Sequence, residues 1–187
     1  MSSILKVDQL QDSGGNAIIT SNGSGTFTSS LPNTGITMAD QWRITADTNA
    51  STDADITTNW ERADDTVWSG IGTGLTNTSG IFSFPQTGIY LILGMFSVTM
   101  TTDAGAGIRL DTTNNNSTYT ADARSYVGSK EGSTVYGAVS FQFIMDVTDI
   151  TTHKFKFVTT SFATSTKVKG DTNLNQSSFT VLRIGDT

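Results

Sequence analysis

The residues that could carry out catalysis are few in this sequence, and their spacing matches no catalytic motif. His153 is the only histidine, and it lies in a polar stretch beside Thr151 and Thr152. A catalytic histidine needs a nucleophile and an orienting carboxylate, and the sequence alone places neither next to it. Glu61 and Glu131 are the only glutamates, and neither lies in a motif that brings two acids to a glycosidic bond. We therefore predict that the protein is not an enzyme and retain a small glycosidase only as an alternative.

Two groups of Asp and Asn residues contain the oxygen ligands that calcium prefers: Asp111 with the asparagines of residues 114–116, and Asp53 with Asp55. Neither group has the ligand spacing of an EF-hand loop, and polar hairpin tips commonly contain these residue types. The glycine-rich residues 70–74 lack the flanking strand and helix of a phosphate-binding loop. The absence of cysteine excludes thiolate metal sites. We therefore predict no metal ion and no other cofactor.

The composition indicates a β-protein with many polar turns. The chain has 187 residues, only two prolines and 15% charged residues, and Thr, Ser, Asn and Gly dominate. Its net charge of −6, without basic clusters, argues against nucleic acid as a partner. No apolar stretch is long enough to span a membrane, and the N-terminal residues lack the features of a signal peptide. We expect a protein that is made in a cytoplasm and has no membrane partner.

The strand predicted for residues 89–100 organises the rest of the chain, because both of its faces are apolar. An antiparallel strand with one solvent-exposed face alternates apolar and polar residues. One face can pack on the core of the domain, whereas the other needs helices, which this sequence hardly offers, or another copy of the chain. Gly94 would allow close approach of that copy. The residues expected to line either the core or a subunit interface are Ile89, Tyr90, Leu91, Ile92, Leu93, Phe96 and Val98.

The remaining apolar patterns predict an antiparallel sandwich of roughly eight to ten strands. The clearest is residues 135–147, in which alternate apolar side chains are assigned to the core. The other predicted strands cover residues 42–45, 56–62, 81–84, 106–110, 119–126, 154–163 and 179–184.

The N-terminal residues differ from the rest, and we divide the chain into an arm with a flexible linker, residues 1–35, and a head, residues 36–187. The arm contains a predicted hairpin, which is marginally stable in isolation, and residues 21–30 read as the linker. We therefore expect residues 1–30 to bind another protein by strand pairing. The apolar residues expected to anchor the arm are Ile4, Leu5, Val7, Leu10, Ile18 and Ile19.

The order of motifs in the head resembles the globular domain of the C1q/TNF superfamily. The resemblance rests on residues 84–90, Phe-Pro-Gln-Thr-Gly-Ile-Tyr, on the Asp-containing turn that ends residues 141–149, and on the Ser-Ser-Phe of residues 177–179. It covers about residues 37–187 and implies a jelly roll that packs as a homotrimer, for binding and not for catalysis. The chain lacks the collagen stalk and cysteines of vertebrate members, which argues against a receptor or complement role.

The first 28 residues and residues 60–85 are similar to segments of virion proteins of marine bacteriophages that infect cyanobacteria and related hosts. This similarity implies a virion structural protein at the virion surface: a homotrimeric fibre, knob or capsid decoration whose arm attaches to another virion protein. The short linker favours a capsid decoration or short fibre. The alternative is a tail-fibre knob that recognises host surface glycans through the loops at residues 101–107, 111–118 and 164–176.

Overall fold

The computed structural model describes residues 7–29, 35–49, 51–101, 104–128, 134–163 and 165–187. The regular elements in these ranges are all β-strands, and the strand pairings are antiparallel. The predicted all-β, antiparallel fold class is therefore confirmed. Within the described ranges there is no helix of the length and hydropathy needed to cross a membrane.

The chain divides into two compact units, residues 1–34 and residues 35–187. The first unit is a three-stranded sheet in which β2 (Ala17–Ser21) pairs with both β1 (Gln9–Gln11) and β3 (Phe27–Ser29). The expectation that residues 21–30 form only a flexible linker was wrong, because β3 lies within them and pairs with Ile19 to Ser21. The strand pairing of this unit is local, through two tight turns.

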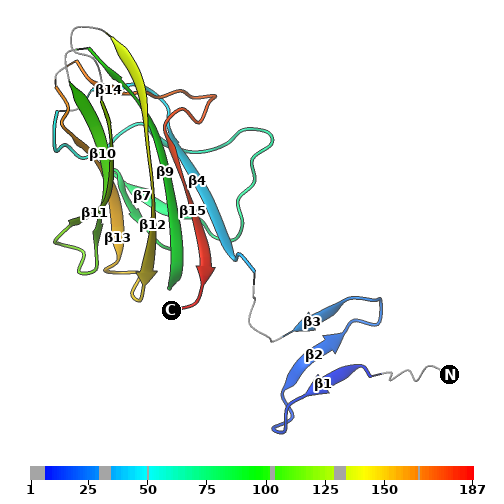
Figure 1. Ribbon diagram of the computed structural model, residues 1–187. Helices are drawn as coiled ribbons and strands as arrows, with labels where there is room; N and C mark the ends of the chain where they lie inside the picture. Colours follow the sequence, from blue (N-terminus) through cyan, green and yellow to red (C-terminus); the bar gives the residue numbers. More distant parts are fainter. Residues whose placement is uncertain (1–6, 30–34, 50, 102–103, 129–133, 164) are drawn as a thin grey trace. The chain divides into compact units, whose positions relative to one another are not determined.

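The second unit, the head, is a sandwich of two sheets (Figure 1). We call the larger one the β9 sheet, in which β9 (Gly88–Met100) pairs with β12 (Val135–Val147) on one side and with β15 (Ser178–Gly185) and β14 (Lys167–Val168) on the other. The sheet continues from β15 to β4 (Met38–Ile44) and then β6 (Trp60–Arg62), and from β14 to β5 (Thr48–Asn49).

The smaller sheet of the head, the β10 sheet, has the strand order β11-β10-β13-β8-β7. The sequence predicted every strand of this sheet apart from β7, which lies at its edge. Their bounds are β7 (Thr76–Thr78), β8 (Ile81–Ser83), β10 (Gly105–Thr113), β11 (Thr120–Gly128) and β13 (Lys154–Thr160).

The core between the two sheets is dominated by aromatic side chains. Phe179 of β15 lies 4.7 Å from Phe82 and 4.9 Å from Phe157, measured between ring centroids. The Phe96 ring of β9 lies 5.0 Å from Phe157. These contacts tie the β9 sheet to the β10 sheet, and fully burying a residue of this size contributes about 1.5–3 kcal/mol.

Two glycines, one on β9 and one on β12, make room for the side chains that pack around β12. A Cβ atom on Gly94 would lie 2.6 Å from Cζ of Phe141, and one on Gly137 would lie 2.6 Å from a methyl carbon of Val127. Gly94 is buried and faces the core. The expectation that it admits a second chain was therefore wrong: the space beside it is filled by the chain's own Phe141.

Tyr90 fixes the corner that precedes β9. Its side chain is fully buried, and its hydroxyl donates a hydrogen bond to the carbonyl oxygen of Gln86 at 2.8 Å. Burial raises the pKa of Tyr90, because a phenolate would be poorly solvated there, although Arg183 acts in the opposite direction. The corner thus depends on a neutral tyrosine.

Candidate functional sites: an uncovered sheet face and a polar cavity

The outer face of the β9 sheet, on the side away from the core, is partly apolar and is open over β9 and β12, whereas at β4 Arg43 is buried beside Glu61, Asp64 and Asp65. Residues directly opposite one another in an antiparallel sheet share a face, so the register defines its rows. In one row Leu91 lies between Ile144 of β12 and Leu182 of β15. In the next row Leu93 lies between Gln142 and Thr180.

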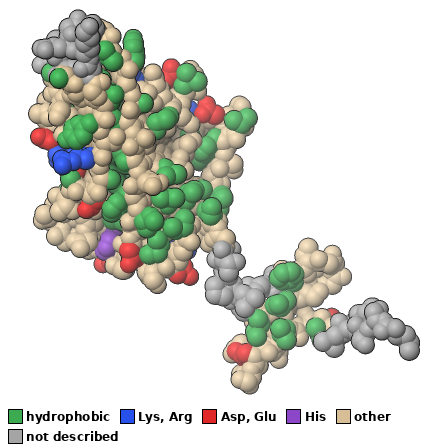
Figure 2. Space-filling view, viewed as in Figure 1, with side chains coloured by type: hydrophobic (Ala, Val, Ile, Leu, Met, Phe, Trp, Pro, Cys, Tyr) green, Lys and Arg blue, Asp and Glu red, His purple; other side chains and the backbone are tan. Residues whose placement is uncertain are grey.

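The apolar side chains of this outer face are accessible in a single chain. Leu93 is 37% exposed, Met95 is 48% exposed and Ile144 is 60% exposed. Figure 2 shows hydrophobic side chains gathered over this part of the head. Two hollows of about 450 and 530 Å³ lie on the face, one beside Leu93 and Ser140 and the other beside Leu91 and Ile144. Exposed apolar patches are typical of interaction surfaces when they are large and contiguous.

The side chain of Gln41, on the outer face, is hydrogen-bonded within the chain. The side-chain amide of Gln41 donates a hydrogen bond to Oγ1 of Thr180 at 2.9 Å, and its oxygen accepts one from Asn175 at 2.9 Å. Among the described residues that β9, β12 and β15 direct to this face, Asp146 alone carries a charge at neutral pH. Covering this part of the face would therefore leave the Gln41 side chain paired.

The structure separates the predicted β9 residues into two sets. Tyr90, Ile92, Phe96 and Val98 are buried in the core. The remaining three, Ile89, Leu91 and Leu93, lie on the outer face and are partly or substantially exposed.

The residues predicted to anchor the arm are only partly described. Ile4 and Leu5 lie outside the described residues. Leu10 pairs with Ile19 in the small sheet, which places both on one face, and Phe27 lies on the same face because it pairs with Ser21. Leu10 and Phe27 are largely exposed, as is Val7, which precedes β1. Ile18 points to the opposite face of β2 and is partly exposed.

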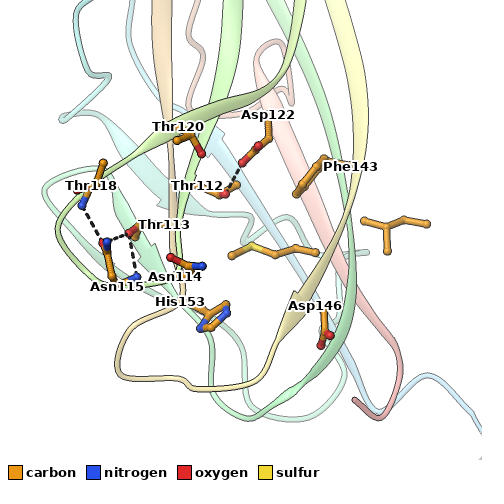
Figure 3. A pocket seen from close by; sticks show the side chains of 12 residues that line it. Thr112, Thr113, Asn114, Asn115, Thr118, Thr120, Asp122, Phe143, Asp146 and His153 are labelled. Atoms are coloured by element: carbon orange, nitrogen blue, oxygen red, sulfur yellow. Dashed lines mark hydrogen bonds between the residues drawn. The ribbon is translucent and has the colours of Figure 1, made fainter.

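A polar cavity of about 440 Å³ opens between the tip of the β10–β11 hairpin and the end of β12 (Figure 3). Thr112 and Thr113 end β10, Asp122 lies near the start of β11, and His153 follows the turn after β12. The hairpin also contributes Asn114, Asn115, Thr118 and Thr120, and β12 contributes Phe143, Ile144, Met145 and Asp146.

Hydrogen bonds within the turns fix the shape of the cavity. Oδ1 of Asn115 accepts a hydrogen bond from the backbone N–H of Thr118 at 2.8 Å and one from the hydroxyl of Thr113 at 3.0 Å. The hydroxyl of Thr112 donates to the carboxylate of Asp122. The cavity is therefore lined by a pre-formed hairpin tip.

His153 is oriented by the same kind of turn. Its Nδ1 lies 3.0 Å from the carbonyl oxygen of Asp149 and 3.2 Å from the hydroxyl of Thr152. In the tautomer that donates from Nδ1 to this carbonyl, Nε2 is the acceptor. The carboxylate of Asp149 accepts two hydrogen bonds from Thr151, at 2.7 and 2.8 Å, and these lower the pKa of Asp149. The prediction that His153 lies in a turn is correct, but the residue also lines the cavity.

The carboxylates considered for calcium already have cationic partners. Asp111 accepts a hydrogen bond from Nε of Arg109 at 2.8 Å, and Asp53 accepts one from the same guanidinium at 2.6 Å. Asp55 accepts one from Nζ of Lys156 at 2.7 Å. Among the described residues no group of three or more His, Cys, Asp or Glu side chains could hold a metal ion.

Of the two glutamates considered for a glycosidase, the structure describes Glu61. Glu131 lies outside the described residues. Glu61 contacts the buried guanidinium of Arg43 at 3.2 Å, together with Asp64 and Asp65. Burial acts to lower the pKa of Arg43, but the three carboxylates outweigh it and leave this pKa raised. The cluster holds a buried cation in place and binds the Glu61 segment to β4.

Comparisons with known proteins identify the fold. No protein-family model matches the chain, and no curated protein matches it. Among solved structures, Eiger TNF from S. frugiperda superposes with a TM-score of 0.63 at 15% identity, covering 81% of this chain and 95% of that one.

Two further structures agree with this assignment. Murine APRIL gives a TM-score of 0.58 at 11% identity and covers 78% of this chain and 98% of that one. The globular domain of zebrafish complement 1qA protein gives 0.53 at 12% identity and covers 80% and 99% of the two chains. The predicted jelly-roll class is therefore confirmed, and the head of this protein has the fold of TNF and C1q domains.

Proposed function

We propose that the protein is a non-enzymatic structural protein of a bacteriophage virion. Its head assembles as a homotrimer through the outer face of the β9 sheet and is displayed at the virion surface as a knob, short fibre or capsid decoration. The N-terminal unit attaches the head to another virion protein. The uncovered apolar face carries this proposal, because a sheet with two apolar faces needs a cover on each.

The outer face has the properties that self-association requires. Its centre is formed by Leu91, Leu93 and Met95, and its polar neighbour Gln41 is hydrogen-bonded within the chain. Charges are depleted at the cores of protein interfaces. On β9, β12 and β15 the one charged residue of this face is Asp146, at the end of β12, and the ion pair of Arg43 with Glu61 lies at its β4–β6 margin. A head with the jelly-roll fold and such a face fits assembly with copies of itself.

The virion assignment rests on the resemblance of residues 1–28 and 60–85 to marine bacteriophage virion proteins that is described under the sequence. The structure of the N-terminal unit is compatible with attachment, because its face with Leu10, Ile19 and Phe27 is apolar and largely exposed. A sheet of three short strands buries little surface by itself. A receiving protein would supply the missing cover.

Light scattering of the full-length protein tests the assembly, and we expect the mass of three chains. Immunogold labelling of purified particles tests the location, and we expect labelled particles with the label on the head or on short fibres. A monomer at micromolar concentration would contradict the homotrimer. Absence of the protein from purified particles would contradict the virion role whatever the mass.

A further inference from the structure

The cavity between the β10–β11 hairpin tip and β12 has two chemically different walls. Figure 3 shows Phe143 on the β12 side, and Thr113, Asn114 and His153 on the other. Met145, on the same face of β12 as Phe143, extends the apolar wall, whereas Ile144 and Asp146 lie on the outer face of that strand. A sugar ring has the matching character, because its C–H faces are apolar and its rim carries hydroxyl groups. Small-molecule sites commonly combine apolar walls with a few fixed polar groups.

The charge of the lining excludes some ligand classes. Its ionisable side chains are Asp122, Asp146 and His153, and none of the lining residues is Lys or Arg. An anionic ligand would meet two carboxylates without a fixed cation to offset them. The described residues also lack a group of three or more ligands for a metal ion.

The polar groups are placed to exchange hydrogen bonds with hydroxyls. Asp122 accepts one hydrogen bond from Thr112, and a carboxylate has about four acceptor positions, so others remain for a ligand. In the tautomer in which Nδ1 of His153 donates to the carbonyl of Asp149, Nε2 is an acceptor for a hydroxyl. The amide of Asn114 provides both donors and an acceptor.

We propose that this cavity binds a neutral, polyhydroxylated ligand of the carbohydrate class. The inference deepens the proposed surface role by assigning the head a ligand. The cavity is formed within one chain, and the residues tested below, Asp122 and Asn114, belong to the β10–β11 hairpin and not to the outer face of the β9 sheet. Failure of light scattering to show trimers and failure of a sugar to bind are therefore separate outcomes.

Two measurements on the full-length protein test this proposal. A glycan array containing neutral and acidic glycans shows which class is retained, and we expect neutral ones. Because His153 is the only histidine, its Cε1–H NMR signal at a fixed alkaline pH reports on the cavity without ambiguity. Titration with methyl glycosides of glucose, galactose and mannose, and with N-acetylglucosamine, should shift this signal saturably for at least one sugar. Glucuronate and a simple alkylamine serve as charged controls.

Matched variants locate the binding. Asp122→Asn should lower the affinity for the retained sugar by about tenfold, which corresponds to about 1.4 kcal/mol. Asp8→Asn in the N-terminal unit should leave this affinity unchanged. Asn114→Ala should weaken it as well, in contrast to Asn173→Ala in an exposed loop elsewhere. The proposal is overturned if no neutral glycan binds in either measurement, or if only the charged controls shift His153. Unchanged affinity in both cavity variants would also overturn it.

Discussion

The two faces of β9 contain similar amino acids but have different surroundings. Phe96 and Ile92 on one face are fully buried between the sheets, whereas Leu93 and Met95 on the other are 37% and 48% exposed. The apolar pattern therefore shows that a residue will be covered, but not which molecule covers it. The same sequence rule leads to a core on one side and, in our proposal, to a subunit interface on the other.

The largest effect is expected from a charge on the inner face. Phe96→Asp places an unpaired carboxylate in the aromatic core beside Phe157 and Phe141, which costs more than about 4 kcal/mol. We expect the head to lose its cooperative thermal transition, followed by circular dichroism. A melting temperature close to that of the wild type would show that the inner face is not the core.

An aspartate introduced three residues earlier, on the outer face, should disrupt assembly and leave the fold intact. Leu93→Asp places a carboxylate on a face that is open to solvent in the single chain. In the proposed trimer three such carboxylates, one from each chain, would lie close together and repel one another. We expect light scattering to give monomers, with dissociation enhanced at least about tenfold, and an unchanged circular dichroism spectrum. Val67→Asp, at a side chain that is 95% exposed, is the control and should remain trimeric. Trimeric Leu93→Asp would remove the outer face from the interface.

A methyl group on the inner face tests how tightly β12 packs there. Gly94→Ala would place Cβ 2.6 Å from Phe141, and overpacking of this kind typically costs about 1–3 kcal/mol. Chemical denaturation should show this loss, while Gly185→Ala, whose added Cβ meets nothing within 4 Å, should have little effect. Equal stabilities of the two variants would indicate that Phe141 moves aside without cost.

The smallest effect is expected at the corner where β9 begins. Tyr90→Phe removes the hydrogen bond to Gln86 and should cost about 1 kcal/mol at neutral pH. Because burial raises the pKa of Tyr90 in the folded head, the unfolded chain loses this proton first as the pH rises. Wild-type stability should therefore decrease above about pH 10, and the variant should lose less over that range. Tyr136→Phe, at an exposed position, is the control and should keep the wild-type profile.

Much of the fold was predictable because the strands have strong periodic signals. The predicted bounds of β12 match the structure, and those of β9 differ by one residue. The strands that were missed in the head, β5, β7 and β14, have two or three residues each and form only because neighbouring strands offer partners. The third strand of the N-terminal unit was missed because Gly, Ser and Thr also suit a linker.

The sites were less predictable because they combine residues that are distant in the sequence. Asp122 lay in no motif, and residues 141–149, which contain Phe143 and Asp146, indicated the fold but no site. Only the packing of the β10–β11 hairpin beside β12 brings them to one cavity with His153. Gly94 was expected to make room for a second chain because the sequence shows its position on β9. It does not show that the ring of Phe141 from the neighbouring strand occupies that space. Alternation assigns a face, but tertiary packing decides what lies on it.

β12 also has a consequence for how the protein behaves before it assembles. This strand pairs with β9 along thirteen residues, and among the described residues no strand pairs with its other edge. A long open edge can recruit strands from other chains, and the charged residue that β12 offers against such contact is Asp146, near one end. Newly made heads would therefore face a competition between ordered oligomers and irregular aggregates, so yield should depend on how quickly the partner copies are found.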